Sequence, residues 1–491
     1  MRISVITLLL AFQVSVTNCG GPLSSVNNRA GSSSHPGGGS NPPGNPNSTI
    51  SIFPESETLR IGGQRQFSGW DATVGQYDVT WNLEEGTEAG SITADGLYTA
   101  PSTPGTFHLI ATSSHNTALS ASAPLTIVSV GFVPVGNTAI ARLGHTATLL
   151  SDGSILVAGG NSGATPSAEL FTPGSSSFVP TFGAMVYARS GHCATILPNG
   201  WVLIVGGGDG QGRFFKTAEL FNPVTQSFSA TGDLSHERTG ATATLLPSGK
   251  VLIAGGQDSS GALLSSAELY DLSTGMFTMT GNMQFRRAQH TATLLPDGKV
   301  LLVGSVTESA SAELFDPVSG IFSPTGSLIQ PRVHHTATLL PSGNVLVAGG
   351  TQIMPPGGGG APSAPVSVHT TEIYDSVRGI FQNGKQLRTA RDSHSATLLA
   401  NGTVLIVGGY VHDFDGDAQS EWYTISSAEV FDPANSASSV AASLETDRAQ
   451  HIATLLNDGE VLITGGVSGH LAPCCHPHPY AVSLARVELY K

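Results

Sequence analysis

Residues 287–304 read RAQHTATLLPDGKVLLVG, and this stretch decides the fold because its pattern recurs along the chain. It opens with Arg287 and His290, continues with a short apolar run, turns at Asp297-Gly298 and ends in a second apolar run. Two short β-prone runs joined by Asp-Gly predict an antiparallel hairpin.

Seven units of this kind follow Gly131, although the third has Ala241 in place of the His. Each unit has an Arg at the start of its first strand: Arg142, Arg189, Arg238, Arg287, Arg332, Arg391 and Arg448. Each also has a Glu in a third strand: Glu169, Glu219, Glu268, Glu313, Glu372, Glu429 and Glu488. In the first five units a later Phe begins a fourth strand. Four strands in each unit of about fifty residues predict the blades of a β-propeller.

A double glycine closes the second strand of every unit except the fourth, which has Gly304-Ser305. The double glycine, the later aromatic residue and the spacing resemble kelch repeats over residues 131–491. Phe replaces the Trp common in kelch repeats, and Ser438 stands where the sixth unit should have its Phe. The last unit stops after its third strand, so we expect residues 131–137 to close it. That gives a seven-bladed propeller with no open sheet edge.

The first 19 residues resemble a secretory signal, because one Arg precedes an apolar run too short to span a bilayer. The tetrapeptide VTNC (16–19) resembles a bacterial lipobox, in which the Cys, here Cys19, is lipidated; Asn18 departs from the small residue usual before it. The alternative is plain secretion. Either alternative places the folded part outside the cytoplasm, as a cell-surface or outer-membrane lipoprotein or as a secreted protein.

Two segments separate this signal from the repeats. Residues 20–49 are mostly Gly, Ser, Pro and Asn, which predicts a flexible tether. Residues 50–128 contain short β-rich runs, with Trp81 expected as a core anchor. The phrase GLYTAP (96–101) and a final alternating strand resemble bacterial immunoglobulin-like domains. This resemblance implies a β-sandwich that acts as a spacer or adhesive module.

Composition excludes some partners. The chain has 21 Lys and Arg against 35 Asp and Glu, a net charge of −14. Nucleic-acid binding is not expected, because neutralising phosphates needs clustered cations. No later segment is apolar for long enough to span a bilayer, so we expect membrane contact only through the lipid anchor. We expect the protein to be a monomer.

The recurrent Arg and Glu residues have two interpretations. We predict that they are structural and tie the strands of each blade together. In the alternative, the seven arginines form a ring at the mouth of the central channel and contact an anion, because Arg at this position can face the ligand in kelch propellers that bind acidic peptides. Either way, identical groups make a poor catalytic site, since chemistry needs different groups in different roles.

Differences between the units indicate where a ligand binds. From the second position of the double glycine to the strand-three Glu there are 8 to 12 residues in units one to four, but 20 to 22 in units five to seven. Connections between strands two and three emerge on the same face as the Arg-bearing strand starts. We therefore expect three long loops to cluster on that face, where binding often resides. The loop of unit five (351–369) is nearly uncharged and is either a lid or a plain insertion.

The loop of unit six reads YVHDFDGDAQSEWY (410–423). Alternating carboxylates followed by a Glu are typical of calcium loops, and the candidate ligands are Asp413, Asp415, Asp417 and Glu421. A solvated acidic loop is the alternative. Trp422 and Tyr423 are candidates for stacking on a sugar or peptide, or for anchoring the loop.

The loop of unit seven contains GHLAPCCHPHPY (469–480). Imidazole and thiolate suit zinc or copper, and the candidate ligands are His470, Cys474, Cys475, His476 and His478. Two alternatives stay open: a strained disulfide between the adjacent cysteines, or a loop that Pro and Cys merely stiffen.

The function that these features favour is a non-catalytic, surface-tethered binding or adhesion protein for a glycan or a protein. The rival is a copper oxidase, because galactose oxidase also combines a kelch propeller with immunoglobulin-like domains. Its copper site uses two Tyr, two His and a Cys cross-linked to one Tyr. This chain has Cys193 and Tyr187, but it lacks that family's Tyr-His ligand pair and its C-terminal domain. No oxidase residue is therefore carried over.

Overall fold

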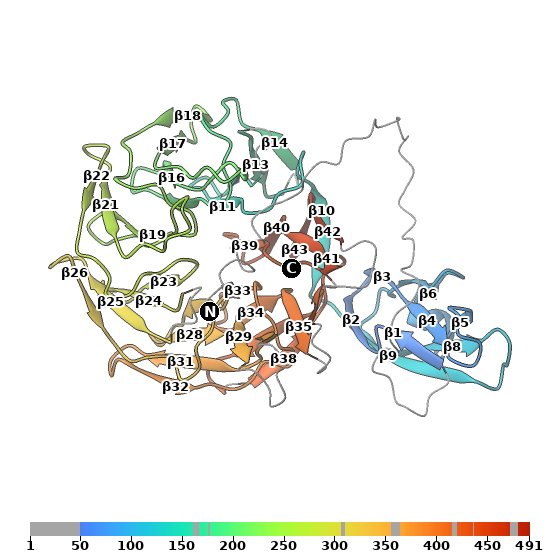
Figure 1. Ribbon diagram of the computed structural model, residues 1–491. Coiled ribbons are helices and arrows are strands. Elements are labelled where there is room, and N and C mark those ends of the chain that lie inside the picture. Colours follow the sequence, from blue (N-terminus) through green and yellow to red (C-terminus); the bar gives the residue numbers. More distant parts are fainter. Residues whose placement is uncertain are drawn as a thin grey trace. The chain divides into compact units, whose positions relative to one another are not determined.

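The computed structural model describes residues 50–160, 166–174, 177–305, 310–354, 364–414, 420–435, 437–471 and 480–491. The described chain forms two compact units, one of residues 50–57 and 64–126 and the other of 58–63 and 127–491 (Figure 1). Among the described residues, a single turn of 3-10 helix, η1 (Gly86–Ala89), is the only helix. None of the described helical residues forms a segment long and apolar enough to cross a membrane. The predicted all-β class is confirmed.

The first unit is built from short strands. They are β1 (Ile50–Phe53), β2 (Glu57–Arg60), β3 (Gln64–Gln66), β4 (Ser68–Asp71), β5 (Val79–Leu83), β6 (Ser91–Ile92), β7 (Leu97–Thr99), β8 (Gly105–Ser113) and β9 (Ser120–Val128). They pair in the orders β2-β9-β8-β5, β3-β7-β6 and β1-β4. Tyr98 of the GLYTAP phrase is fully buried beside Phe67. Trp81 is only half-buried, contrary to expectation, because β5 is an edge strand.

The second unit is a seven-bladed β-propeller, in which seven four-stranded antiparallel sheets surround one axis (Figure 1). Blades one to three are β11 (Thr146–Leu149), β12 (Ile155–Ala158), β13 (Ala168–Thr172), β14 (Ser177–Pro180); β15 (Cys193–Ile196), β16 (Val202–Val205), β17 (Ala218–Asn222), β18 (Ser227–Ala230); and β19 (Thr242–Leu245), β20 (Val251–Ala254), β21 (Ala267–Asp271), β22 (Met276–Met279). Blades four and five are β23 (Thr291–Leu294), β24 (Val300–Val303), β25 (Ala312–Asp316), β26 (Ile321–Pro324); and β27 (Thr336–Leu339), β28 (Val345–Ala348), β31 (Thr371–Asp375), β32 (Ile380–Asn383). Blades six and seven are β33 (Ser395–Leu398), β34 (Val404–Val407), β37 (Ala428–Asp432), β38 (Ala437–Ala441); and β39 (Ile452–Leu455), β40 (Val461–Thr464), β43 (Arg486–Tyr490), β10 (Phe132–Asn137).

Blade seven is closed by a strand from the beginning of the repeat region, as the sequence predicts. Strand β10 pairs antiparallel with β43, with Phe132 opposite Tyr490. Their ring centroids are 5.1 Å apart, close to the 4.8–4.9 Å of the aromatic pairs in blades one to five. Blade six lacks this pair, because Ser438 lies opposite Phe431. The closure removes a sheet edge that would otherwise be exposed.

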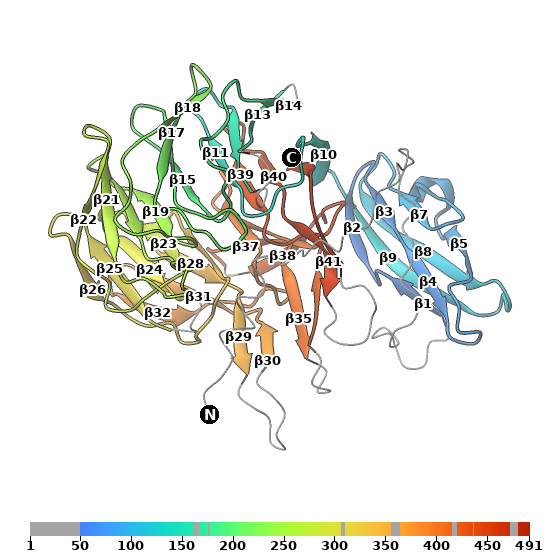
Figure 2. The same ribbon diagram turned by 45° about the horizontal axis from the view of Figure 1, so that its top comes forward.

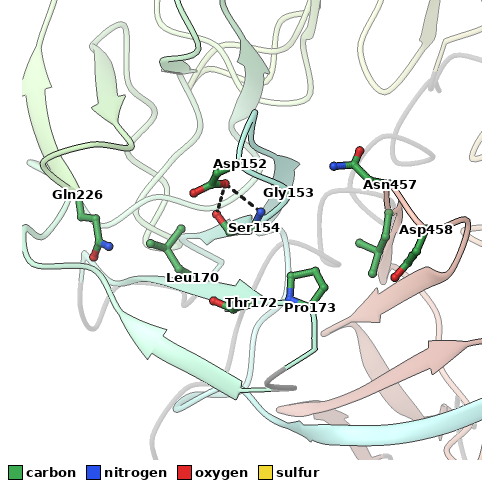
Figure 3. Close-up of a pocket in the computed structure, with 10 residues that line it drawn as sticks. Asp152, Gly153, Ser154, Leu170, Thr172, Pro173, Gln226, Asn457 and Asp458 are labelled. Atoms are coloured by element: carbon green, nitrogen blue, oxygen red, sulfur yellow. Dashed lines mark hydrogen bonds between the residues drawn. The ribbon is translucent and has the colours of Figure 1, made fainter.

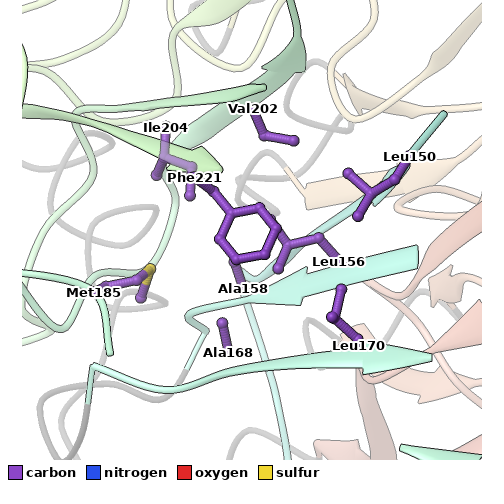
Figure 4. Close-up of a cluster of buried hydrophobic side chains, with 9 residues drawn as sticks. All are labelled: Leu150, Leu156, Ala158, Ala168, Leu170, Met185, Val202, Ile204 and Phe221. Carbon is purple, nitrogen blue, oxygen red and sulfur yellow. The ribbon is translucent and has the colours of Figure 1, made fainter. Parts of the chain in front are cut away.

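The hydrophobic core lies mainly between adjacent blades. The second strand of each blade is buried along its whole length, which explains why its residues are apolar, with Thr464 in blade seven as the exception. Figure 4 shows one such seam, where Phe221 of blade two packs against Leu156 and Ala158 of blade one. Because buried apolar side chains fill each seam, neighbouring blades stabilise one another.

The double glycine lets two blades approach each other. Gly159 and Gly160 both have positive φ, at 66° and 82°. A Cβ at Gly159 would lie 2.4 Å from the carbonyl oxygen of Arg189 in the next blade, and one at Gly160 would lie 2.6 Å from the backbone nitrogen of His145. Glycine is therefore required there by both conformation and space.

Candidate functional site

Blades five, six and seven each send an extra hairpin from one face of the propeller. The sequence predicts loops here; the structure instead shows strands β29 (Thr351–Met354), β30 (Ala364–Ser367), β35 (Tyr410–Phe414), β36 (Ser420–Thr424), β41 (Val467–Leu471) and β42 (Tyr480–Ser483). They are strands because β-branched and aromatic residues lie on both sides of the three central segments. The second double-glycine residue directly precedes each hairpin, and Figure 2 shows β29, β30 and β35 extending from the same side.

The hairpins of blades six and seven form one sheet, in the order β35-β36-β41-β42, which we call the accessory sheet. Strand β30 of the blade-five hairpin contacts β35. Each hairpin starts beside a recurrent Arg, because isolated bridges join Val333 to Thr351, Asp392 to Tyr410 and Ala449 to Val467. The predicted clustering of the three insertions above the Arg-bearing strand starts is confirmed.

A buried carboxylate, Asp392, anchors this assembly, and sequence reasoning missed it. The hydroxyl of Ser367 on β30 donates to Asp392 Oδ2 over 2.7 Å, and Ser393 donates to Oδ1 over 3.0 Å. The Nε2 atom of His412 on β35 lies 3.5 Å from Oδ2. The signal in the sequence was that blade six alone has a carboxylate directly after its recurrent Arg.

A second carboxylate, Asp447, holds the other end of the accessory sheet. Thr424 on β36 and Ser468 on β41 both donate their hydroxyl groups to Asp447 Oδ2. The Thr424 hydroxyl oxygen also accepts the N–H of Gly469 over 3.0 Å. Asp447 directly precedes Arg448, so both anchoring carboxylates lie next to a recurrent Arg. The accessory sheet is thus bonded to the rigid inner part of the propeller.

The two aromatic candidates on β36 have different surroundings. The ring of Trp422 stacks on that of His412 with centroids 3.9 Å apart, and His412 is only 5% exposed. Burial lowers the pKa of His412, and the neighbouring Asp392 opposes this shift. Tyr423 is 37% exposed. Trp422 therefore anchors the sheet, whereas Tyr423 is accessible to a ligand.

Strand register places further candidates in one row with Tyr423. Tyr423 pairs with Val411 on one side and with His470 on the other, and His470 pairs with Tyr480. These four residues therefore occupy one row across the accessory sheet. The row crosses all four strands, so it belongs to no single blade.

The two predicted metal sites fall mostly outside the described residues. Asp413 and Glu421 pair across the β35–β36 hairpin, and His470 is on β41. The other predicted ligands lie outside the described residues: Asp415, Asp417, Cys474, Cys475, His476 and His478. Cys19 also lies outside them. The calcium and zinc or copper sites therefore stay predictions.

The recurrent Arg residues are buried rather than presented to a ligand. All seven are 0–1% exposed. Each donates from Nη2 to the Glu of its own blade over 2.6–2.9 Å. Each also donates from Nη1 to the carbonyl of the first double-glycine residue, or of Gly304 in blade four, over 2.6–3.2 Å. This geometry agrees with the prediction that the arginines are structural. The alternative, in which they form a ring of ligand contacts, is wrong because their side chains are buried.

The recurrent His residues join neighbouring blades. His192 lies 3.0 Å from the Thr146 hydroxyl of the preceding blade, and the same contact recurs at 2.8–3.1 Å in four other seams. Burial, with a contribution from the nearby Arg, lowers the pKa to about 3 for His145, His192, His290, His335 and His451. These imidazoles are therefore neutral structural groups and not general bases.

Two seams depart from this pattern in an informative way. Blade seven has Ile452 where the other blades offer a hydroxyl or a thiol, and His145 bonds instead to Thr464, the cross-strand partner of Ile452, over 2.9 Å. Between blades two and three the His is Ala241, and Cys193 replaces the Thr. The Cys193 thiol donates to the Ala241 carbonyl over 3.0 Å. Burial raises the pKa of that thiol to about 12, so it is not a reactive nucleophile.

A hollow also lies on the opposite face, lined by turns of blades seven, one and two (Figure 3). Asp152 belongs to a turn and accepts the N–H and hydroxyl of Ser154, as Figure 3 shows. Asp458 likewise accepts the N–H of Glu460 within its own turn. These carboxylates are used by the repeated turns, so this hollow has the chemistry of the scaffold and not of a distinct site.

Comparisons with known proteins identify the fold. Neither a comparison with protein-family models nor one with curated protein sequences found a match. Among solved structures, the chain is similar to a fungal alcohol oxidase of the AA5 family in complex with copper, at 15% identity and a TM-score of 0.57, over 74% of this chain and 76% of that one. It also matches the structure of YjhT at 12% identity and a TM-score of 0.48, over 62% and 99%. At 15% identity, the likeness to the fungal oxidase shows a kelch-like β-propeller fold alone.

Proposed function

We propose that this protein is an extracytoplasmic, surface-tethered binding protein whose ligand, a glycan or a protein, contacts the accessory sheet. The observation that carries the proposal is that insertions from three consecutive blades assemble on one face, while blades one to four have short connections there. The accessory sheet is not part of any blade, so building the propeller does not account for it. Presenting binding residues on a rigid support is a common role for such an insertion.

The accessible residues of the accessory sheet support this role. Tyr423 is exposed and pairs with Val411 and His470, and Val482 on β42 is 57% exposed. Aromatic side chains on a rigid strand offer a large contact area at small entropic cost. Asp392 contacts residues of β30 and β35, and Asp447 contacts residues of β36 and β41, so the two carboxylates hold these strands on the propeller. The result is a pre-organised surface.

The N-terminal segments fit a tethered protein. Lipidation of Cys19 would anchor the chain, residues 20–49 would act as a flexible tether, and residues 50–128 would act as an immunoglobulin-like spacer. Metabolic labelling with a radioactive fatty acid tests the anchor. Label should enter the wild type and not Cys19→Ser, and an unlabelled wild type would favour plain secretion.

Copper chemistry gains no support from the described residues. In the described ranges, the only three carboxylate, His or Cys ligands close enough to share an ion are Glu84, Glu85 and His108 of the first unit, and not a group on the accessory face. The Tyr187 ring packs against that of Phe215 in a tilted arrangement, and the Cys193 thiol donates to a backbone carbonyl. A copper-radical site does not fit these residues, so no oxidase step is derived. Metal content of the purified protein tests the calcium and the zinc or copper predictions in the two loops.

Binding to immobilised glycans and extracellular proteins tests the proposal, with a pair of matched Tyr variants. Tyr423 on the accessory sheet and Tyr187 before blade two have nearly equal exposure, 37% and 38%. Tyr423→Ala should weaken binding at least several fold, as truncating an aromatic contact residue often does. Tyr187→Ala should leave binding unchanged. Equal effects of the two substitutions would contradict the proposal.

A further inference from the structure

A second candidate binding surface lies around the propeller axis, at the second residue after each recurrent Arg, directly before the recurrent His or, in blade three, Ala241. The seven positions are Gly144, Gly191, Gly240, Gln289, His334, Ser393 and Gln450, which we call the axial ring. They lie two residues before the innermost strands, which contact one another in a closed circle. Their backbones also bond from blade to blade, as in Gly191 N–H to Gly144 C=O over 2.8 Å and Gln450 N–H to Ser393 C=O over 2.9 Å.

All seven axial-ring residues have a left-handed backbone. The glycines of blades one to three have φ of 61–68°, and the four side-chain-bearing residues of blades four to seven have φ of 51–56°. Glycine adopts this conformation without strain, whereas residues with a Cβ do so at a cost. Blades one to three show that glycine serves the fold at this position. The side chains in blades four to seven are thus present despite a conformational cost.

Strained non-glycine residues that cluster are a reason to look for function. Four of the five non-glycine residues with positive φ in the described chain belong to the axial ring. They occupy consecutive blades, and three of those blades carry the accessory hairpins. Gln289 and Gln450 are exposed, and His334 and Ser393 are half-buried. The strained side chains therefore form a polar crescent on the same face as the accessory sheet.

The crescent is uncharged and rich in hydrogen-bonding groups. His334 Nε2 lies 2.8 Å from Gln289 Oε1, so the imidazole donates there and its other nitrogen is an acceptor. Burial lowers the pKa of His334, and the nearby Asp392 opposes this shift. Among the described residues, nothing bonds to the side-chain amide of Gln450. Amide, imidazole and hydroxyl groups together offer both donors and acceptors to a ligand.

The buried charged groups beside the crescent are already used. The recurrent Arg residues are buried and paired with Glu, so they do not attract an anion. Asp392 is buried and accepts bonds from Ser367 and Ser393, so it does not attract a cation. A charged ligand would lose hydration here, and these buried groups offer it no available partner. A neutral ligand with many hydroxyl groups matches the donors and acceptors best.

We infer that the axial ring of blades four to seven is a binding subsite for a neutral oligosaccharide, with Gln289, His334, Ser393 and Gln450 as its hydrogen-bonding residues. The inference rests on the proposed binding function and names its substrate class. A peptide is less suited, because peptide sites depend on buried aromatic or Arg anchors, and the crescent provides none. The accessory sheet would then contact the part of the chain-like ligand that extends beyond the axis.

The test replaces the four strained residues with the glycine that blades one to three already have. The variant Gln289→Gly/His334→Gly/Ser393→Gly/Gln450→Gly should keep or raise the melting temperature, because glycine relieves the left-handed strain. Gln226→Gly is the matched control. Gln226 is the remaining strained residue, with φ of 51°, and lies in a blade-two turn where blades three to five have glycine. It should keep binding intact.

Binding is measured with cellohexaose, chitohexaose, xylohexaose and maltohexaose, with oligogalacturonate and a peptide library as charged and peptide probes. Wild type and Gln226→Gly should bind at least one neutral hexaose, and the fourfold variant should lose about tenfold or more in affinity. Preference for oligogalacturonate or peptide, unchanged affinity of the fourfold variant, or a lowered melting temperature in it would each overturn the subsite. If Tyr423→Ala alone reduces binding, the proposed function stands and the axial subsite fails. A wild type that binds no probe overturns the subsite, and if it also binds none of the immobilised glycans and extracellular proteins, the proposed function fails with it.

Discussion

Blades one to four and blades five to seven contain the same four-stranded sheets, but they differ in the connection between strands two and three. In blades one to four the segment between strands two and three is short. In blades five to seven it forms paired hairpins, anchored by Asp392 and Asp447 to the inner part of the propeller. A similar division, shifted by one blade, runs through the axial ring, where blades one to three have glycine and blades four to seven have Gln, His, Ser and Gln.

The difference separates two kinds of polar group. Arg, Glu and His recur in nearly every blade and are buried. Arg and Glu bond to each other and to the backbone, and His bonds to a hydroxyl group of a neighbouring blade, so they hold the scaffold together. Polar residues found in only one blade, such as Asp392 and Asp447, support the accessory sheet. Recurrence therefore indicates folding, and departure from it indicates the candidate function. The predictions below test this division, from the largest expected effect to the smallest.

Acid should destabilise the scaffold through its recurrent His residues. Their pKa values are lowered to about 3 in five blades and lowered well below the usual value for His394. The unfolded chain, with pKa about 6.5, therefore binds more protons between about pH 6.5 and 3, and stability falls as pH falls through that window. Each His can cost about 1.4 kcal/mol per pH unit there. Melting temperature should drop steeply below pH 6, with a smaller slope in His335→Gln. A constant melting temperature down to pH 4.5 would contradict the buried neutral state.

Removing one partner of a recurrent ion pair should be costly. Arg332→Ala leaves Glu372 buried without its cation, so we expect a loss of about 3–5 kcal/mol of unfolding free energy. Arg378→Ala is the control, since Arg378 is a surface residue 3.7 Å from Asp375 and should cost less than about 1 kcal/mol. Denaturant titration measures both. Similar effects of the two substitutions would show that the recurrent pair is not structural.

Removing a buried side chain of the closing strand β10 should lower the free energy of unfolding about as much. Phe132 is buried against Tyr490 in blade seven, so Phe132→Ala should cost about 3–5 kcal/mol. Phe182 is 86% exposed, and Phe182→Ala should stay within about 0.5 kcal/mol of wild type. Thermal unfolding compares them. A mild effect of the first substitution would argue against closure by β10.

Removing the hydroxyl group of the blade-seven seam should lower stability, and restoring a hydroxyl at the neighbouring position should recover it. Thr464→Ala leaves buried His145 without its partner and should cost about 1–3 kcal/mol. Adding Ile452→Thr returns a hydroxyl to the position used by the other seams, so the double variant should recover most of the loss. No recovery would mean that the exchange between these two positions does not serve the seam.

Loosening the accessory sheet should leave the scaffold nearly intact. Asp392→Ala removes the acceptor of Ser367 and the partner of His412, whereas Asp392→Asn keeps an acceptor. Hydrogen exchange should rise in β30 and β35 for the Ala variant alone, with a local cost of about 1–3 kcal/mol. Faster exchange throughout the propeller would show that the two regions are not separable.

The propeller could be predicted because its signal is repeated seven times. Each blade needs the same turn, the same buried second strand and the same Arg–Glu pair, so errors in one unit are corrected by the others. Closure by residues 131–137 followed from counting strands. The structural interpretation of the arginines followed because a residue present in all seven blades is expected to serve the structure that all seven blades share.

The accessory sheet could not be predicted in the same way. Its strands pair between blades six and seven, residues such as Tyr423 and His470 being far apart in sequence, and no repeat announces the register. Asp392 looked like an ordinary charged residue, because its partners Ser367 and His412 lie in insertions with no counterpart elsewhere. The strain of Gln289 and His334 was equally hidden, since φ is not visible in a sequence, although the glycines of blades one to three at that position were a clue.

The most direct test of the division is to shorten the insertions of blades six and seven to the length found in blade one, and to measure binding and thermal unfolding on the same protein. The account predicts that the shortened propeller still unfolds cooperatively, within a few degrees of wild type, and that binding to glycans and extracellular proteins is lost. A variant that keeps its binding, or one whose propeller no longer folds, would contradict it.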